Sequence, residues 1–383
     1  MALSLCVVVI FTALGTAFLT RSLGENLIGH RSAARQAAFY LAEGGLDQAS
    51  VNLRTLDDVT DDVLTNTLPT GTFHISNPPA SLGNGRWQIF SDGDSQGEHA
   101  RLEAIFELTP QSIFQFAMFG DQGVTVNGNV QTDSYNSQLG PYNSNPASPT
   151  YNQSQHGDVG TSSTTSGSID LGSSVLIKGQ LTVGPNVADP QSVVTGFDPS
   201  LVTANPKVVS ATLPYPMPVV AVPFGLLCPD LTVSSQQTVT LSPTGGMLNN
   251  GTYCYRDLEV KGGGTLTASG PVAVYLTYQL TLRGNATVGV PSTPSNMLFL
   301  MAPTSDAVLQ PEVLTGSSVF YGAIYGPEAT IRIQGNASVF GSVIAKDVYT
   351  TGSASIHYDQ ALSQFNKVTN LYQRRLISWR HLQ

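Results

Sequence analysis

The sequence contains few charged residues. Asp, Glu, Lys and Arg make up 11% of the 383 residues, with 17 basic and 26 acidic side chains and a formal net charge of −9. Binding to nucleic acid requires clustered Lys and Arg opposite the phosphates. Basic residues cluster here only at Arg374, Arg375 and Arg380. We therefore expect no nucleic-acid partner.

Cysteine is also scarce, and the sequence has no C-x-x-C, P-loop or G-x-G-x-x-G motif. Of the three cysteines, Cys6 lies in an apolar run and is best explained as a small hydrophobic residue. Cys228 and Cys254 could form a disulfide in an oxidising compartment, or could remain two unpaired thiols. The acidic turns Asp57–Asp62 and Asp92–Asp94 lack calcium-loop spacing and are expected to be solvated. No metal or cofactor is predicted.

Catalytic motifs are weak. Glycosidase chemistry uses two carboxylates about 5–9.5 Å apart, and the candidate pairs are Asp257 with Glu259 and Asp347 with Asp359. His357 precedes Asp359 by two residues, but no nucleophile elbow accompanies them. Two acids on one strand face are common on solvated sheets. We therefore expect that the chain is not an enzyme, and a carbohydrate-active enzyme remains the less favoured alternative.

The N-terminal segment Met1–Leu19 contains no charged residue. It just reaches the length of about 20 residues that spans a bilayer as a helix. No basic residue precedes it, and Arg21 follows it, so a cleaved signal peptide is the weaker interpretation. No proline occurs before Pro69, so one helix can extend to about Leu56.

Small and apolar residues continue along one face of this helix beyond the apolar run, at steps of three and four residues. Such a stripe allows close packing of helices. A simple membrane anchor would not need it, which favours a helix that leaves the bilayer to pack against copies of itself. The predicted assembly residues are Met1, Leu3, Leu5, Val8, Phe11, Leu14, Phe18, Leu23, Leu27, Ala34, Ala38 and Leu41.

The segment Ala38–Leu46, which reads AFYLAEGGL, resembles the N-terminal helix of type IV pilin-like proteins, in particular the PilX-like pilus assembly family. Asp133–Tyr142, Ser355–Leu362 and Ser378–Arg380 resemble signatures found with such N-termini. The resemblance implies a leader removed by a prepilin peptidase, with methylation of the new N-terminus. Met1 is therefore expected to be the processed and methylated residue. Leu5 departs from the family, because major pilins carry Glu there.

The region after the helix is expected to be mainly β. Alternating runs at Thr72–Ser76, Arg86–Ser91 and Ala100–Leu108 predict a small antiparallel sheet within residues 57–120. It is expected to lie against the helix, as in pilin heads.

A nine-residue pattern centred on glycine recurs from Val124 onward, with clear copies at Leu280–Val288 and Ile331–Val339. Short strands that repeat near 20 residues predict a β-solenoid, here a right-handed β-helix, over residues 121–361. A β-sandwich is the alternative. Residues 134–168 and 189–229 are expected to be long loops, and residues 362–383 a C-terminal helix that caps the solenoid.

Together these features predict an α+β fold, mainly β, and a structural role. We expect a subunit of an extracellular type IV pilus-like filament, built by bundling of N-terminal helices with solenoid heads outside. The alternative is a membrane-anchored minor pilin or adhesin. The implied partners are copies of the chain or other pilins, the inner-membrane pilus assembly machinery and, before assembly, the membrane.

Overall fold

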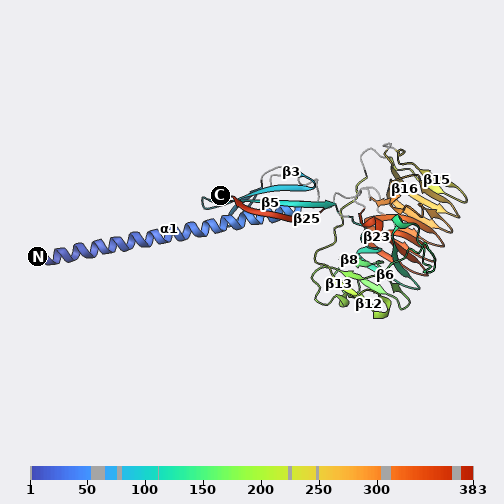
Figure 1. Ribbon diagram of the computed structural model, residues 1–383, viewed down its shortest axis with the longest axis horizontal. Helices are drawn as coiled ribbons and strands as arrows, with labels where there is room; N and C mark the ends of the chain where they lie inside the picture. Colours follow the sequence, from blue (N-terminus) through green and yellow to red (C-terminus); the bar gives the residue numbers. More distant parts are fainter. Residues whose placement is uncertain are drawn as a thin grey trace. The chain divides into compact units, whose positions relative to one another are not determined.

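The computed structural model describes residues 2–52, 65–75, 80–110, 112–222, 227–246, 250–302, 312–364 and 372–382. The chain divides into two compact units (Figure 1). Unit 1 comprises Met1–Gln111 and Asn366–Gln383, and unit 2 comprises Ser112–Phe365. Unit 2 is thus inserted into the sequence of unit 1. The fold is mainly β with one N-terminal helix and an antiparallel sheet, as the sequence predicted.

Unit 1 combines the helix α1 (Ala2–Asn52) with an antiparallel sheet in the order β1-β2-β4-β5-β25, in which β3 also pairs with β4. The predicted end of the helix near Leu56 lies outside the described residues. The strands are β1 (Thr65–Leu68), β2 (Gly71–Ile75), β3 (Ala80–Gly83), β4 (Arg86–Ser95), β5 (Glu98–Pro110) and β25 (Tyr372–Leu382).

The C-terminal half of α1 packs on this sheet. Buried residues alternate with half-buried ones along β4, the pattern of a strand with one face on a core. The core is formed by Leu41, Ala42, Leu46 and Ala49 of the helix and by Phe73, Ile75, Ile89, Leu102, Ala104, Phe106 and Leu108 of the sheet.

The predicted C-terminal helix over residues 362–383 is wrong for the described part, because Tyr372–Leu382 is the strand β25. This strand pairs antiparallel with β5. Glu107 receives the Arg375 guanidinium at 2.6 Å, and Glu103 receives that of Arg380. Pairing with a distant strand outweighs the local helical spacing of the apolar residues, because helix propensity is a weak prior.

Unit 2 contains a 19-stranded sheet in which every pairing between the named strands is parallel. Its first strands are β6 (Met118–Val126), β7 (Gln131–Tyr135), β8 (Val159–Thr161), β9 (Ile169–Leu171), β10 (Leu176–Ile177), β11 (Leu181–Val183), β12 (Val194–Thr195) and β13 (Val208–Ser210). The later strands are β14 (Leu231–Val233), β15 (Thr238–Leu241), β16 (Thr252–Lys261), β17 (Thr265–Ala268), β18 (Val272–Arg283), β19 (Thr287–Val288), β20 (Met297–Met301), β21 (Glu312–Leu314), β22 (Val319–Ile333), β23 (Ser338–Thr350) and β24 (Ser355–Asp359).

The strands form three parallel stacks, and we call one passage of the chain through the stacks a rung. Long strands such as β22 and β23 bend and take part in more than one stack. One continuous ladder shows how the rungs share a core, because each of its residues is buried. This ladder runs through Val233, Val260, Leu282, Leu314, Ile333, Thr350, Val126 and Leu171.

The glycine of the sequence repeat lies at a corner between two stacks. Gly335 and Gly352 adopt φ angles of 70° and 89°, which favour glycine. A Cβ on Gly352 would lie 2.6 Å from the carbonyl oxygen of Gly335 in the neighbouring rung. The repeat therefore marks the point where the backbones of successive rungs approach most closely.

The spatial order of the rungs differs from their order in the sequence. The last rung, formed by β23 and β24, pairs with β6 and β7 of the first. In Figure 1 the colours along unit 2 accordingly pass from yellow through orange to red, and then change to teal and green. We call this junction of β23 and β24 with β6 and β7 the seam.

A connection must therefore join the two ends of the stack. Among the described residues β13 pairs only with β11 and β14 only with β16, so the chain passes from one end of the stack to the other between β13 and β14. We call residues 211–222 the strap. The Tyr215 ring packs on Phe116 and Phe119 with centroids 5.3 and 4.4 Å apart, and its hydroxyl donates to the Ile113 carbonyl.

The two predicted long loops contain regular structure. Residues 134–168 include the 3-10 helix η2 (Ser137–Leu139) and β8, and residues 189–229 include β12 and β13. These strands are only two or three residues long, so the polar and proline-rich composition around them hides their pattern. The right-handed β-helix stays a prediction, since strand pairing gives the direction of the strands and not the hand of a coil.

Candidate functional site

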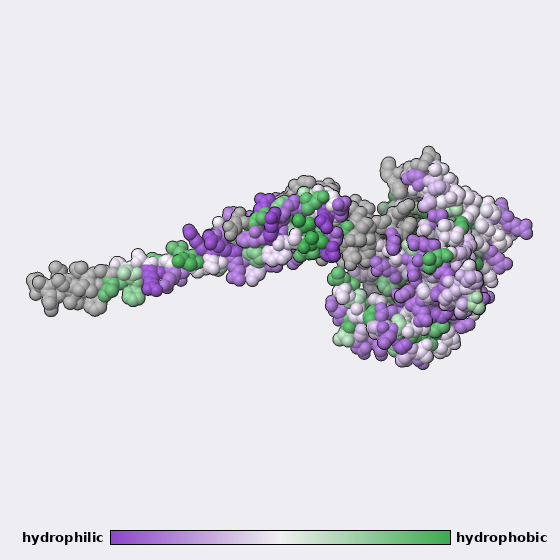
Figure 2. Space-filling model, viewed as in Figure 1, coloured by the Kyte–Doolittle hydropathy of each residue, from purple (hydrophilic) through white to green (hydrophobic). Residues whose placement is uncertain are grey.

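The part of α1 before the sheet exposes large apolar side chains. Leu14, Phe18, Leu23 and Leu27 are 52 to 73% exposed, and Leu19 and Ile28 are exposed beside them. Figure 2 shows hydrophobic atoms on the surface of this stretch. Several large apolar side chains exposed on one short stretch indicate a site of interaction with protein or membrane. These residues therefore form the candidate assembly surface, and they include four of the residues predicted for it.

The other predicted assembly residues have different positions. Ala34, Ala38 and Leu41 are buried in unit 1, at no more than 6% exposure, so they do not face another molecule. A Cβ on Gly93 of β4 would lie 2.0 Å from the Ala38 carbonyl oxygen. The small residues thus bring the helix close to its own sheet, which corrects their predicted role. The side chains of Met1, Leu3, Leu5, Val8 and Phe11 lie outside those described.

No helix in the described part of the chain is long and apolar enough to cross a membrane. The side chains described in α1 are Thr12 and those of residues 14–49, so most of the predicted span Met1–Leu19 precedes them. The predicted membrane stage has no support from the structure.

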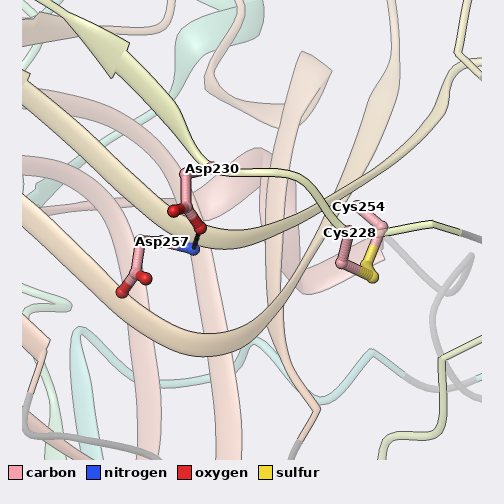
Figure 3. Close-up of a disulfide and its surroundings, with 4 residues drawn as sticks. All are labelled: Cys228, Asp230, Cys254 and Asp257. Carbon is pink, nitrogen blue, oxygen red and sulfur yellow. Dashed lines mark hydrogen bonds between the residues drawn. A yellow bond between two sulfur atoms is a disulfide. The ribbon is translucent and has the colours of Figure 1, made fainter.

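The carboxylate pair on β16 is engaged in ion pairs. Glu259 binds the charged ends of Lys261 and Arg283, and its pKa is lowered, first by the hydrogen bond from Lys261. Asp257 accepts a 2.7 Å hydrogen bond from Arg256, and its backbone N–H donates to Asp230 (Figure 3). Burial raises the pKa of Asp257. These bonds give both carboxylates a structural role.

The carboxylates of the second candidate pair, Asp347 and Asp359, lie in different parts of unit 2. Asp359 is fully buried, and its Oδ1 accepts hydrogen bonds from the backbone N–H groups of Ser137 at 2.9 Å and Ala361 at 3.1 Å. Burial raises the pKas of Asp359 and Asp347. Asp347 lies in the stack that contains β22 and β6, beside Thr330 and Gly123, whereas Asp359 pairs with Tyr135 in another stack. The two carboxyls therefore do not form one site.

His357 binds a carboxylate that the sequence did not identify as a site. Its Nδ1 lies 2.5 Å from Oδ1 of Asp133, which has no exposed surface. Oδ2 of Asp133 accepts from Gln153 and, at 2.8 Å, from the Tyr142 hydroxyl. Burial opposes ionisation, but the hydrogen bonds from His357, Gln153 and Tyr142 outweigh it and lower the Asp133 pKa.

This cluster belongs to the seam. His357 and Asp133 are register partners on β24 and β7, although 224 residues separate them in the sequence. Nearby, Tyr358 donates to the Phe114 carbonyl at 2.7 Å and Ser342 to that of Phe116 at 2.7 Å. The resemblance had drawn attention to residues 133–142 and 355–362 separately. Both segments lie in the seam, where β24 pairs with β7.

The predicted disulfide between Cys228 and Cys254 is present, with Cα atoms 4.7 Å apart (Figure 3). It fastens the segment that follows the strap to β16. Closing a loop of this size stabilises a protein by about 3.5 kcal/mol in the chain-entropy model.

The acidic turns have basic partners where they are described. Asp92 lies 3.6 Å from Arg101, and Asp94 pairs with His99. Asp57–Asp62 lies outside the described residues. Within the described ranges no group of three or more His, Cys, Asp or Glu side chains could hold a metal ion.

Comparisons with known proteins give few matches. Residues 228–365 match the model of a domain of unknown function, DUF7305, which covers the rungs from β14 to the seam. No curated protein matches the chain. Among the solved structures that resemble the chain, two are 14% identical to it. The match to the competence-associated pilin ComZ from Thermus thermophilus covers 91% of this chain and 97% of the ComZ chain, with a TM-score of 0.32. The match to the DUF3494 domain of a Shewanella frigidimarina ice-binding protein covers 66% of this chain and 99% of that domain's chain, with a TM-score of 0.29.

Proposed function

We propose that this chain is a structural subunit of an extracellular type IV pilus-like filament, in which the exposed parts of α1 from many copies bundle together. The observation that carries the proposal is the uneven burial of one helix. Its C-terminal half is covered by the sheet of unit 1, and Leu14 to Ile28 have no such cover. A bundle of like helices would bury these side chains. The AFYLAEGGL motif at Ala38–Leu46, typical of PilX-like pilins, supports the same assignment.

The chemistry of the described side chains supports a role without catalysis. Of the carboxylates considered for hydrolysis, Asp257 and Glu259 form ion pairs, and Asp359 accepts hydrogen bonds from backbone N–H groups. As part of the same proposal, Met1–Leu19 waits in a membrane and then enters the filament core. Exchange of apolar residues between lipid and a protein core costs little, so packing between helices decides whether assembly proceeds.

Substitution of Leu27 by Asp tests the proposal. In cells that assemble the filament, Leu27→Asp should abolish it, because a carboxylate would be buried in the bundle without a partner. Ser32→Asp adds the same charge at an exposed polar position of the same helix and should leave the filaments intact. Electron microscopy of sheared surface material counts the filaments. Normal filaments that contain the Leu27→Asp chain would refute the proposal.

A membrane-anchored subunit that never polymerises is the main rival. It would leave the wild-type chain in the membrane fraction and no filaments in the sheared material, so the same preparation decides between the two.

A further inference from the structure

Unit 2 carries a polar groove at one corner of its rungs. The groove has a volume of about 440 Å³ and is lined by Ser137, Gln138, Ser292, Thr293, Ser295, Ala361 and Gln364. No lining residue is charged. The carboxylates and the disulfide described above do not line it, so the groove is unused by the proposed filament role.

The groove arises because neighbouring rungs turn this corner in different ways. After β19 the chain inserts the 3-10 helix η5 (Pro294–Asn296) before β20 begins. After β24 and β7 it inserts η6 (Gln360–Gln364) and η2. Between these rungs, β22 and β23 pass the corner with no insertion, at Gly322 and Gly341. The insertions carry all the lining residues and form two walls. The short corners of β22 and β23 lie between the walls in the order of the rungs, and we call them the floor.

At the floor the backbones of neighbouring rungs are in close contact, which leaves no room for side chains at the two glycines. A Cβ on Gly341, whose φ is +150°, would lie 1.7 Å from the Gly322 carbonyl oxygen, and a Cβ on Gly322 would lie 2.5 Å from the Met297 carbonyl oxygen. The walls stand three rungs apart, or about 14 Å at 4.8 Å per parallel strand. That separation accommodates one extended chain of small units.

The seam holds the second wall rigidly. Asp359, buried beneath it, accepts hydrogen bonds from the backbone N–H groups of Ser137 and Ala361, one from each of its two segments. Binding to a preformed wall costs less conformational entropy than binding to a loop that must become ordered.

An aromatic stack approaches the first wall. The rings of Tyr321, Phe340 and His357 stack along adjacent rungs with centroids 4.7 and 4.6 Å apart. On its other side Tyr321 adjoins Gly289, whose Cβ would lie 1.9 Å from the Tyr321 carbonyl oxygen. The stack thus ends at Gly289, which has no side chain and lies three residues before the wall residue Ser292.

We infer that this groove binds a neutral oligosaccharide chain. Hydroxyl and amide groups on both walls can donate and accept hydrogen bonds, as sugar hydroxyls do. The uncharged lining offers no partner for phosphate, carboxylate or ammonium groups, whose desolvation would go uncompensated. The inference does not depend on filament assembly, because it concerns unit 2 alone.

The test measures binding of three neutral tetrasaccharides, cellotetraose, maltotetraose and chitotetraose, to the full chain by saturation-transfer NMR. Tetragalacturonate serves as the charged probe. We expect at least one neutral probe to bind, and Gln138→Ala/Ser292→Ala/Gln364→Ala to weaken it at least tenfold. Gln138, Ser292 and Gln364 are exposed, so this variant should fold, and circular dichroism checks that it does.

A second groove on unit 2 provides the matched control. It is of similar size, about 490 Å³, but contains Asp121. Gln122→Ala/Thr165→Ala removes polar groups from it and should leave the affinity unchanged. The inference is wrong if no neutral probe binds, if only tetragalacturonate binds, or if both variants bind the neutral probe as the wild type does.

Discussion

Two adjacent glycines in α1 have opposite surroundings. A Cβ on Gly44 would meet nothing within 4 Å, whereas a Cβ on Gly45 would lie 2.2 Å from Ser91 Oγ and 3.0 Å from the Phe73 ring. Gly44→Ala should therefore raise the free energy of unfolding by about 1 kcal/mol through helix propensity. Gly45→Ala should lower it by about 1–3 kcal/mol through overpacking.

Denaturation followed by tryptophan fluorescence measures both effects, because Trp87 and Trp379, the two tryptophans of the chain, lie in unit 1. Each variant is the control for the other, since they differ by one position in the same helix. If both stabilised the protein equally, the packing of this helix face on the sheet would be wrong.

Asp133 gives the seam a dependence on pH. Its pKa in the folded protein is below the value of 3.8 for an unperturbed Asp. The ionised form is therefore favoured by folding, and this contribution is present above pH 3.8 and is lost as the pH falls through the lowered folded pKa. Asp133→Asn should remove about 2–4 kcal/mol at pH 7, because His357 and the Tyr142 hydroxyl lose a charged partner.

Urea denaturation followed by circular dichroism between pH 2 and 7 measures this contribution. The loss of stability in acid should be smaller in Asp133→Asn than in the wild type. Asp170→Asn, on another stack of the same unit and half-exposed, should keep the wild-type profile. An acid profile of Asp133→Asn identical to that of the wild type would contradict the assignment.

At the scale of elements, the strap depends on one aromatic anchor. The Tyr215 ring packs on Phe116 and Phe119, and Tyr325 donates a hydrogen bond to the Pro218 carbonyl. Tyr215→Ala should lower the free energy of unfolding by about 3 kcal/mol, since it removes a packed aromatic ring.

Leu213→Ala is the matched control in the same segment. Leu213 is more than half exposed, so its truncation should cost less than about 0.5 kcal/mol. Calorimetry of the intact, disulfide-bonded chain measures both. Equal small losses would mean that the strap is not held by Tyr215.

The elements that the sequence predicted are those whose pattern is local. The glycine-centred repeat marks close backbone approach at each corner, and the alternation in β4 and β5 marks one buried face. β25 was missed because its partners, Glu103 and Glu107, lie more than 260 residues away. The seam was missed for the same reason, since nothing near His357 indicates that Asp133 faces it.

The small-residue face of α1 shows a different limit of prediction from sequence. The spacing of Ala34, Ala38 and Leu41 predicts an apolar face, but a helix and a sheet offer the same kind of apolar partner. Only Gly93, placed opposite Ala38 by the sheet, shows which of them covers it.

At the scale of the whole molecule, strand pairing joins distant parts of the sequence at two places. β25 pairs with β5 in unit 1, and β23 and β24 pair with β6 and β7 in unit 2. A chain cut in the strap should therefore remain one particle. With a specific protease site inserted at Leu213, the two fragments should co-elute in native size-exclusion chromatography and separate only in denaturant.

Cleavage at Leu213 leaves the disulfide within one fragment, because Cys228 and Cys254 both follow it. Association of the fragments then reports strand pairing alone. Fragments that separate without denaturant would contradict the seam and the β5–β25 pairing together.

Because unit 2 is one continuous segment inserted into unit 1, a single stretch of coding sequence specifies it. The chain leaves unit 1 after β5 and returns in β25, and Pro110 and Tyr372 at these two points are register partners. Two neighbouring ends of an antiparallel pair can be joined by a two-residue turn. The same site could therefore accept a different folded domain, or none, while the helix and its sheet stay unchanged. In the proposed filament, the domain displayed by a subunit could therefore change while the helix that is proposed to assemble stays the same.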